Sequence, residues 1–405
     1  MISLIKRTII IKIMVFILCL LLVPDMSQTL YADEFIEEEA LTELYTAEAN
    51  GSKDNKLPQI EAGAAIVIDA DSGRILYEKD AYSKRPIAST TKIMTAIVAL
   101  ENGNLDDRVK VSKRAASIWG STIKLREGEE LTLRELMYGM MLKSGNDAAL
   151  AIAEHIGGTV ENFVKMMNDK AKELGLRNTC FKTPHGLDVE GHYSTAYELA
   201  LLTKYALKNP EFSKIVSTKS ISITNRELYT TNEMLSLYPG ADGVKTGYTG
   251  KAGRCLVTSA QRDGFRLISV VLFCSSRTKR AESSKKILDY AFNNYKPYEL
   301  LKPNQKLGTV YVKRGLKNSA TVVSVDGIKL PLSKEEKETL KSEIILNNTI
   351  NSPVYKGVEV GTIRFFVNGK LIAQSDIKTA ESVPAKTYRH YFFDVMDIWF
   401  KLVRG

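Results

Sequence analysis

Ser89 and Lys92, in the stretch "PIASTTKIMTA" at residues 86–96, place a hydroxyl and an amine three residues apart. On an α-helix this spacing brings both side chains onto one face and within contact range. A serine becomes a good nucleophile only when a base removes its proton, and an ordinary lysine, with a pKa of about 10.4, is protonated at neutral pH. The residues after Lys92 are typical of a buried helix, and burial or a second cation would lower the lysine pKa. The pair therefore predicts an activated serine at a helix N-terminus, whose dipole favours developing negative charge. The alternative is a capped helix with a solvent-reaching lysine.

Two later stretches supply further polar groups. In "KSGND", Ser144 and Asn146 fall where two helical patterns meet, so we expect them in a loop that contacts Lys92 and a substrate carbonyl. In "DGVKTGYTGKAG", Lys245 and Thr246 precede Gly247. On an edge strand, a glycine lets an extended peptide lie close to the backbone. A lysine and a hydroxyl beside it would hold a terminal carboxylate.

Together, S-x-x-K, S-x-N and K-T-G form the signature of penicillin-binding proteins and class A β-lactamases. From about residue 60 to 405, the sequence resembles the low-molecular-mass penicillin-binding proteins that act as serine-type D-Ala-D-Ala carboxypeptidases. The resemblance rests on "STTK", "SGN" and "KTG", and on "TPHGLDVEGHYSTAYELA", which is similar to the family's HGLD segment. It implies a β-lactamase/DD-peptidase-like fold, with an antiparallel sheet and a helical subdomain.

The resemblance also implies a role for each matching residue. Ser89 would be the acylated nucleophile and Lys92 its general base. The remaining residues would relay protons or bind the substrate amide (Ser144, Asn146), bind its carboxylate (Lys245, Thr246, with Arg277 nearby), or pair with its backbone (Gly247). The backbone N–H groups of Ser89 and Tyr248 would form the oxyanion hole. For His185 two roles are open: a part in deacylation, or support of the loop backbone.

The expected activity is removal of the terminal D-Ala from peptidoglycan stem pentapeptides through an acyl-serine intermediate, with β-lactams as inhibitors and with no metal or cofactor. A class A β-lactamase is the first alternative, but no E-x-x-L-N element lies between "SGN" and "KTG". An inactive wall-binding module is the second. The motifs do not separate a carboxypeptidase from a transpeptidase or an endopeptidase, because these enzymes differ in what attacks the acyl-enzyme.

The pattern along the chain predicts an α+β fold. Strand patterns around "DADSGRIL" and over residues 217–275 flank a helical middle and precede a closing helix, which gives a catalytic domain over 58–296. Short alternating segments over 297–380 predict a small β-sandwich domain. The 405 residues are enough for two such cores.

Residues 1–32 read as a signal peptide, with basic residues, an apolar run and a polar end at "TLYAD". A retained membrane anchor is the alternative. Residues 33–57 read as an acidic linker. The predicted cut leaves a net charge of +7 from the +9 of the whole chain, because residues 1–32 hold three basic residues and one acidic residue. We therefore expect an exported protein at the extracytoplasmic face of the membrane.

The tail, residues 381–405, comprises a linker and "YRHYFFDVMDIWFKLVRG", whose charges fall three or four residues apart among aromatic and aliphatic residues. This pattern predicts an amphipathic helix that associates with a membrane surface. The alternative is a helix docked on the protein's own surface. Lysines and arginines are scattered, without an array that interleaves them with aromatic residues, so no nucleic-acid partner is expected.

Overall fold

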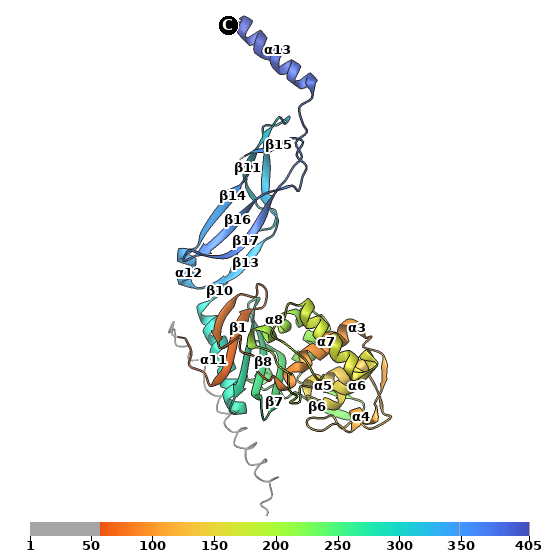
Figure 1. Ribbon diagram of the computed structural model, residues 1–405. Coiled ribbons are helices and arrows are strands. Elements are labelled where there is room, and N and C mark those ends of the chain that lie inside the picture. Colours follow the sequence, from red (N-terminus) through yellow and green to blue (C-terminus); the bar gives the residue numbers. More distant parts are fainter. Residues whose placement is uncertain (1–56, 348, 405) are drawn as a thin grey trace, which may run out of the picture.

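The computed structural model describes residues 57–347 and 349–404. The predicted signal peptide (1–32) and all but the last residue of the predicted acidic linker (33–57) lie outside these residues. Figure 1 shows a body that combines a sheet with a group of helices, an elongated β module above it, and a helix at the end of the chain.

The body is built on one antiparallel sheet with strand order β2-β1-β9-β8-β7. Its strands are β1 (Ala62–Asp69), β2 (Ile75–Lys79), β7 (Ala241–Thr249), β8 (Gly253–Arg262) and β9 (Phe265–Cys274). The strand patterns predicted around "DADSGRIL" correspond to the antiparallel pair β1–β2. β1, the first strand in the described part of the chain, pairs with β9, the last strand of the body, so both ends of the body contribute to the sheet.

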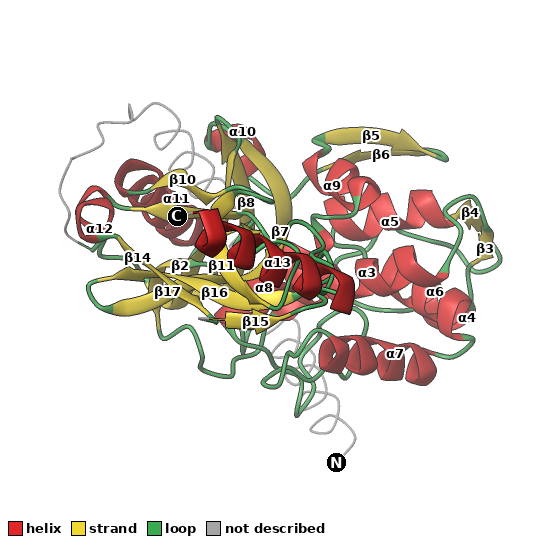
Figure 2. Cartoon of the chain, turned by 90° about the horizontal axis from the view of Figure 1, so that it is seen from above, coloured by secondary structure: helices red, strands yellow, loops and turns green. Residues whose placement is uncertain are grey.

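Both faces of the sheet are covered. Along β1, Ala64 and Ile66 face the core shared with the helices, whereas Ala65 and Val67 face a second core with α11 (Arg277–Asn294). This alternation follows from the two-residue period of a strand. The helices on the first side, seen beside the sheet in Figure 2, are α3 (Lys92–Asn102), α5 (Leu133–Leu142), α6 (Asn146–Gly157), α7 (Val160–Glu173), α8 (Ala196–Ala206) and α9 (Pro210–Ser217).

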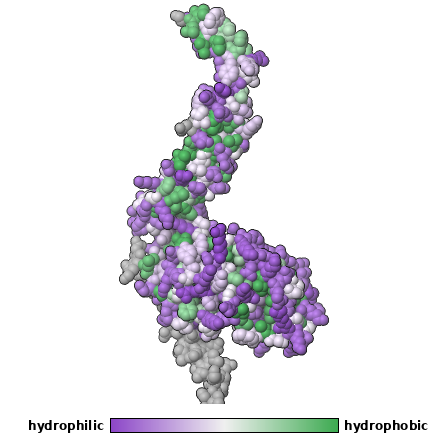
Figure 3. Space-filling model, viewed as in Figure 1, coloured by the Kyte–Doolittle hydropathy of each residue, from purple (hydrophilic) through white to green (hydrophobic). Residues whose placement is uncertain are grey.

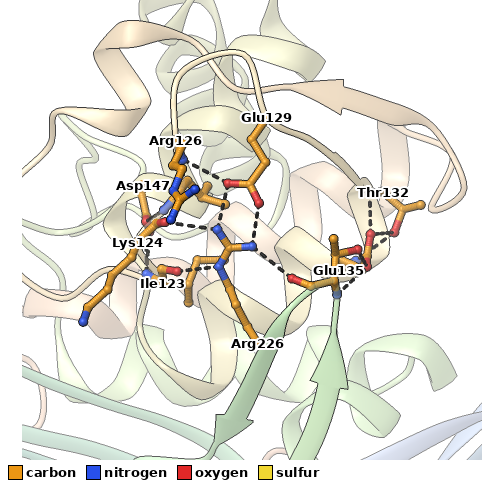
Figure 4. A network of polar contacts seen from close by, with 10 residues as sticks. Ile123, Lys124, Arg126, Glu129, Thr132, Glu135, Asp147 and Arg226 are labelled. Atoms are coloured by element: carbon orange, nitrogen blue, oxygen red, sulfur yellow. Dashed lines mark hydrogen bonds and ion pairs between the residues drawn. The ribbon is translucent and has the colours of Figure 1, made fainter.

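Smaller elements complete the body: η1 (Ala88–Thr91), β3 (Arg108–Lys110), α4 (Lys113–Ala116), β4 (Glu130–Thr132), β5 (Ser220–Ile223), β6 (Arg226–Tyr229) and α10 (Met234–Leu237). Arg226 fastens the β5–β6 hairpin to the helical side (Figure 4). Its guanidinium binds Glu129 and donates to the carbonyls of Ile123 and Lys124. These contacts of Arg226 are therefore structural, because they hold the hairpin against the helical side of the body.

The β module contains two sheets around one core. The pair β10 (Lys296–Leu301) and β13 (Ile328–Leu332) packs with a six-stranded sheet of order β14-β16-β17-β12-β11-β15. The strands of that sheet are β11 (Lys306–Lys313), β12 (Ser319–Ser324), β14 (Lys341–Leu346), β15 (Thr349–Asn351), β16 (Glu359–Val367) and β17 (Lys370–Thr379). Arg74 of the body contacts the module through the Pro331 carbonyl and Glu336 of α12 (Lys334–Thr339).

The last helix, α13 (Tyr388–Arg404), lies apart from the body and buries none of its residues. Its aromatic and aliphatic side chains are exposed, among them Phe392 at 62% and Trp399 at 54%. Figure 3 shows the resulting hydrophobic surface at the end of the molecule. The structure thus contradicts the alternative of a helix docked on the protein's own surface. No helix in the described part of the chain is long and apolar enough to cross a bilayer.

Candidate active site

Ser89 lies in the short turn η1, immediately before α3, and Lys92 is the first residue of that helix. Ser89 is therefore not within the α-helix itself, although the expected contact is present: Lys92 Nζ lies 2.9 Å from Ser89 Oγ. The preceding residue, Ala88, has a φ of 47°. This left-handed conformation, rare for a residue with a side chain, shapes the sharp entry into the turn.

Lys92 is fully buried, and its ammonium nitrogen has three polar neighbours. Besides Ser89, these are the Asn146 side-chain oxygen and the His185 carbonyl, each at 2.8 Å. Burial, followed by the positive charge of Lys245, holds the pKa of Lys92 well below its ordinary value, against an opposing effect of Asp147. Both effects that the sequence analysis named are therefore present, and the second cation is Lys245.

Asn146 begins α6 and is fixed from both ends of its amide. Its oxygen accepts from Lys92, and its nitrogen donates to the Trp119 carbonyl at 2.9 Å. Ser144 lies in the turn before α6 with a φ of 60° and lines the pocket in front of Ser89. Within the "SGN" motif, the expected contact with Lys92 is thus made by Asn146.

Lys245 and Thr246 lie on β7, which is an edge strand as expected. Thr246 lines the pocket, whereas the Lys245 side chain is buried and donates to the Thr246 carbonyl at 3.0 Å. Burial, followed by the charge of Arg280, lowers the pKa of Lys245 to about 7, with Glu233 opposing. The two neighbours in sequence therefore occupy different environments.

Gly247 brings β7 close to the serine turn. A Cβ atom on this residue would lie 3.0 Å from the Ser89 backbone nitrogen and 3.2 Å from the Ile87 carbonyl oxygen. Gly186 approaches the same turn from the other side, and its Cβ would lie 1.9 Å from the Ala88 carbonyl oxygen. The turn that carries Ser89 is thus held between two backbones that leave no room for side chains.

His185 precedes Gly186 and supports this loop. Its ring Nδ1 accepts from the Leu187 backbone N–H at 3.2 Å. Burial, followed by the charge of Lys92, lowers the pKa of His185 to about 3, so its ring is neutral at physiological pH. These contacts are those expected of a histidine that supports the backbone.

The pocket in front of Ser89 encloses about 310 Å³. Its lining combines hydroxyl groups, one aromatic side chain and three guanidinium groups: Ser89, Ser121, Ser144, Thr231, Thr246, Gly247, Tyr248, Arg254, Arg277 and Arg280. Arg277 was expected from the sequence, but Arg254 and Arg280 were missed. No acidic residue lines the pocket within the described residues.

Glu233, beside the pocket, was also missed. Both of its carboxylate oxygens accept from Arg280 at 2.8 Å, and Arg277 Nε lies 3.8 Å away. The side chains of Glu233 and Arg280 are only 4% and 5% exposed. Burial alone would raise the pKa of Glu233, but the charge and hydrogen bonds of Arg280 outweigh burial and hold it low. A buried ion pair thus fixes one wall of the pocket.

Comparisons with known proteins show the family of this chain. Residues 51–276 match the family model described as D-alanyl-D-alanine carboxypeptidase, and residues 295–385 match that of the penicillin-binding protein 5 C-terminal domain. The chain is 39% identical to the D-alanyl-D-alanine carboxypeptidase DacF of Bacillus subtilis, over 88% of this chain and 94% of the relative.

Two solved structures are similar as well. Penicillin-binding protein 5 of Haemophilus influenzae has a TM-score of 0.75 and 31% identity, over 81% of this chain and 99% of that one. The Streptomyces K15 DD-transpeptidase has a TM-score of 0.57 and 37% identity, over 58% and 99% of the two chains. The chain belongs to the D-alanyl-D-alanine carboxypeptidase family of serine-type hydrolases.

Proposed function

We propose that this protein is a penicillin-sensitive carboxypeptidase that removes the terminal D-Ala from peptidoglycan stem pentapeptides. The observation that carries the proposal is the contact of 2.9 Å between Ser89 Oγ and the fully buried Lys92 Nζ. Burial lowers the pKa of Lys92, so this lysine gives up its proton more readily than an ordinary lysine. The resulting free amine, at this distance, can accept the serine proton.

In the proposed reaction, Lys92 takes the proton of Ser89 while Oγ attacks the carbonyl carbon of the penultimate D-Ala. The backbone N–H groups of Ser89 and Tyr248 stabilise the oxyanion, and such a donor contributes about 10² to 10³ in rate. The C–N bond then breaks, and the amine of the leaving D-Ala takes up the proton. Water attacks the acyl-ester in the second half-reaction and releases the shortened peptide and free Ser89.

The remaining site residues position the substrate. The peptide lies along the edge strand β7, where Gly247 allows close backbone approach. Thr246 and Arg277 face its terminal carboxylate, with Lys245 contributing charge from behind. Asn146 orients Lys92, and Ser144 passes the proton towards the leaving group. His185 holds Lys92 through its backbone carbonyl, which is compatible with its low pKa.

The protein works at the extracytoplasmic face of the membrane. Residues 1–32 direct export, residues 33–57 form a linker, residues 58–296 form the catalytic domain and residues 297–380 the β domain. The second family match, which begins at residue 295, supports a boundary between the catalytic and β domains near residue 296. Within residues 381–405, the exposed hydrophobic side chains of α13 support its association with a membrane surface.

The proposal is tested by mass spectrometry of the protein after incubation with benzylpenicillin, followed by an assay of D-alanine release from diacetyl-L-Lys-D-Ala-D-Ala. We expect a stable adduct on the Ser89 peptide, D-alanine release, and loss of both in Ser89→Ala. Rapid penicillin hydrolysis without D-alanine would instead indicate a β-lactamase. If neither an adduct nor turnover is detected, the protein would instead be an inactive wall-binding module.

A second candidate activity is transpeptidation, because the similar Streptomyces K15 protein is a DD-transpeptidase. Adding glycine as an acceptor amine during the peptide assay separates the two. Free diacetyl-L-Lys-D-Ala as the main product supports the carboxypeptidase. A predominant diacetyl-L-Lys-D-Ala-Gly product would assign the chain to transpeptidation.

A further inference from the structure

The three guanidinium groups of the pocket differ in their anionic partners. Arg280 is fully engaged with Glu233, and Arg277 lies 3.8 Å from the same carboxylate. For Arg254, by contrast, no carboxylate lies within 4.0 Å among residues 57–347 and 349–404, although this side chain lines the same pocket as Ser89 and Thr246. Arg254 therefore offers the pocket a positive charge that Glu233 does not neutralise.

Arg254 is held in place by an aromatic ring. It stands on β8 directly opposite Tyr248 of β7, and its guanidinium carbon lies 3.9 Å from the centre of the Tyr248 ring. A guanidinium at this distance from a ring face is attracted to it, which restricts the side chain before any ligand arrives.

The register of the sheet places these groups beside Thr246. Thr246 and Tyr248 are two residues apart on β7 and so project from the same face, and Arg254 joins them as the cross-strand neighbour of Tyr248. Lys245, one residue away, projects from the opposite face and is buried. The charged group exposed next to Thr246 is thus a guanidinium, which binds a carboxylate through two parallel hydrogen bonds.

We infer that Arg254, stacked on Tyr248, is an additional specificity-determining residue that binds the free C-terminal carboxylate of the substrate and the corresponding carboxylate of penicillin. This inference rests on the proposed function and deepens it. It makes recognition of a free carboxylate depend on a group that stays charged at all physiological pH values, whereas Lys245 loses its proton near neutrality.

The test uses the full chain with the substitutions Arg254→Gln and Arg254→Lys. Arg262→Gln is the matched control, because Arg262 lies on the same strand and also stacks on an aromatic ring, that of Tyr238 at 4.7 Å, but does not line the pocket. For each variant we measure kcat and KM with diacetyl-L-Lys-D-Ala-D-Ala. The second-order rate of acylation is measured with benzylpenicillin and with its methyl ester, which lacks the carboxylate charge.

We expect Arg254→Gln to raise KM by about 10- to 100-fold, the range for a lost hydrogen bond to a charged group, with kcat within about threefold. Acylation by benzylpenicillin should fall by a similar factor and acylation by the methyl ester should not. Arg254→Lys should be intermediate, and Arg262→Gln should match the wild type.

Two results would overturn the inference while the proposed function stands: a KM within twofold of the wild type, or equal loss of acylation with the acid and its ester. Equal loss would mean that Arg254 supports the fold of the strand edge. A wild-type chain without any penicillin adduct would instead overturn the proposed function, and the inference with it.

Discussion

Replacing Glu233 by leucine should destabilise the body strongly, because it leaves Arg280 buried without its anion. Both side chains are at most 5% exposed and are joined by two bonds of 2.8 Å. Removing one partner of such a pair typically costs about 3–5 kcal/mol. At roughly 2–4 °C per kcal/mol for a domain of this size, the melting temperature should fall by about 6–20 °C.

The double variant Glu233→Leu/Arg280→Met separates the charge from the packing. An apolar pair of similar volume often replaces a buried ion pair without loss, so the double variant should recover most of the lost stability. Its acylation by penicillin should nevertheless be slower than that of the wild type, because the double variant lacks the Arg280 guanidinium that lines the pocket. Differential scanning calorimetry, with and without prior penicillin acylation to identify the transition of the body, measures the effect. The reasoning would be refuted if the free energy of unfolding of Glu233→Leu fell by less than about 1 kcal/mol, or if the double variant recovered none of the lost free energy.

Three further predictions concern the turn, the loop and the tail. Gly247→Ala should slow penicillin acylation by about 10²-fold without changing the fold, because the new Cβ would lie only 3.0 Å from the Ser89 backbone nitrogen and displace it. Acylation at the wild-type rate in a stopped-flow measurement would contradict this prediction. His185 has a folded pKa of about 3 against an ordinary value of 6.5, so below pH 6.5 only the unfolded chain binds its proton and stability falls towards pH 3. Between pH 6.5 and pH 5, the free energy of unfolding measured in urea should therefore fall by about 2 kcal/mol less for His185→Gln than for the wild type. Equal decreases in the two proteins would show that the ring is not neutral. Deleting residues 388–405 should move the exported protein from membrane to soluble fractions with full D-alanine release, and unchanged partitioning would argue against association through α13.

The sequence was informative where chemistry depends on short spacings. The spacing of three positions from Ser89 to Lys92 means that any helical turn brings the two side chains together, and the structure confirms the contact. The meeting of two helices at Ser144 was also predictable, because turn residues and periodicity mark it, and the edge position of β7 agrees with the role expected of Gly247. The helical subdomain and the β module followed from the same patterns.

Contacts between distant segments were not predictable in this way. Arg254 faces Tyr248 only because the β7–β8 turn sets the strand register, and a register shift of one residue would turn Arg254 to the other face. Glu233 lies at the start of the four-residue helix α10, too short to leave a periodic signal. The His185 contact with Lys92 uses a backbone carbonyl, which no side-chain motif reports.

The cationic lining of the pocket also acts before a ligand makes contact. Three arginines along the described wall face one neighbouring carboxylate, that of Glu233, and the chain keeps a net charge of +7 once residues 1–32 are removed, so the field around the mouth draws anions in. Such steering raises association rates and weakens as salt shortens the Debye length to about 10 Å at 0.1 M. Acylation by anionic penicillins should therefore slow as ionic strength rises, while neutral esters react at a constant rate. Anionic groups fixed in the surrounding envelope would be attracted to the same positive pocket and compete with the substrate. The local ionic composition therefore affects the rate at which this enzyme binds its substrates.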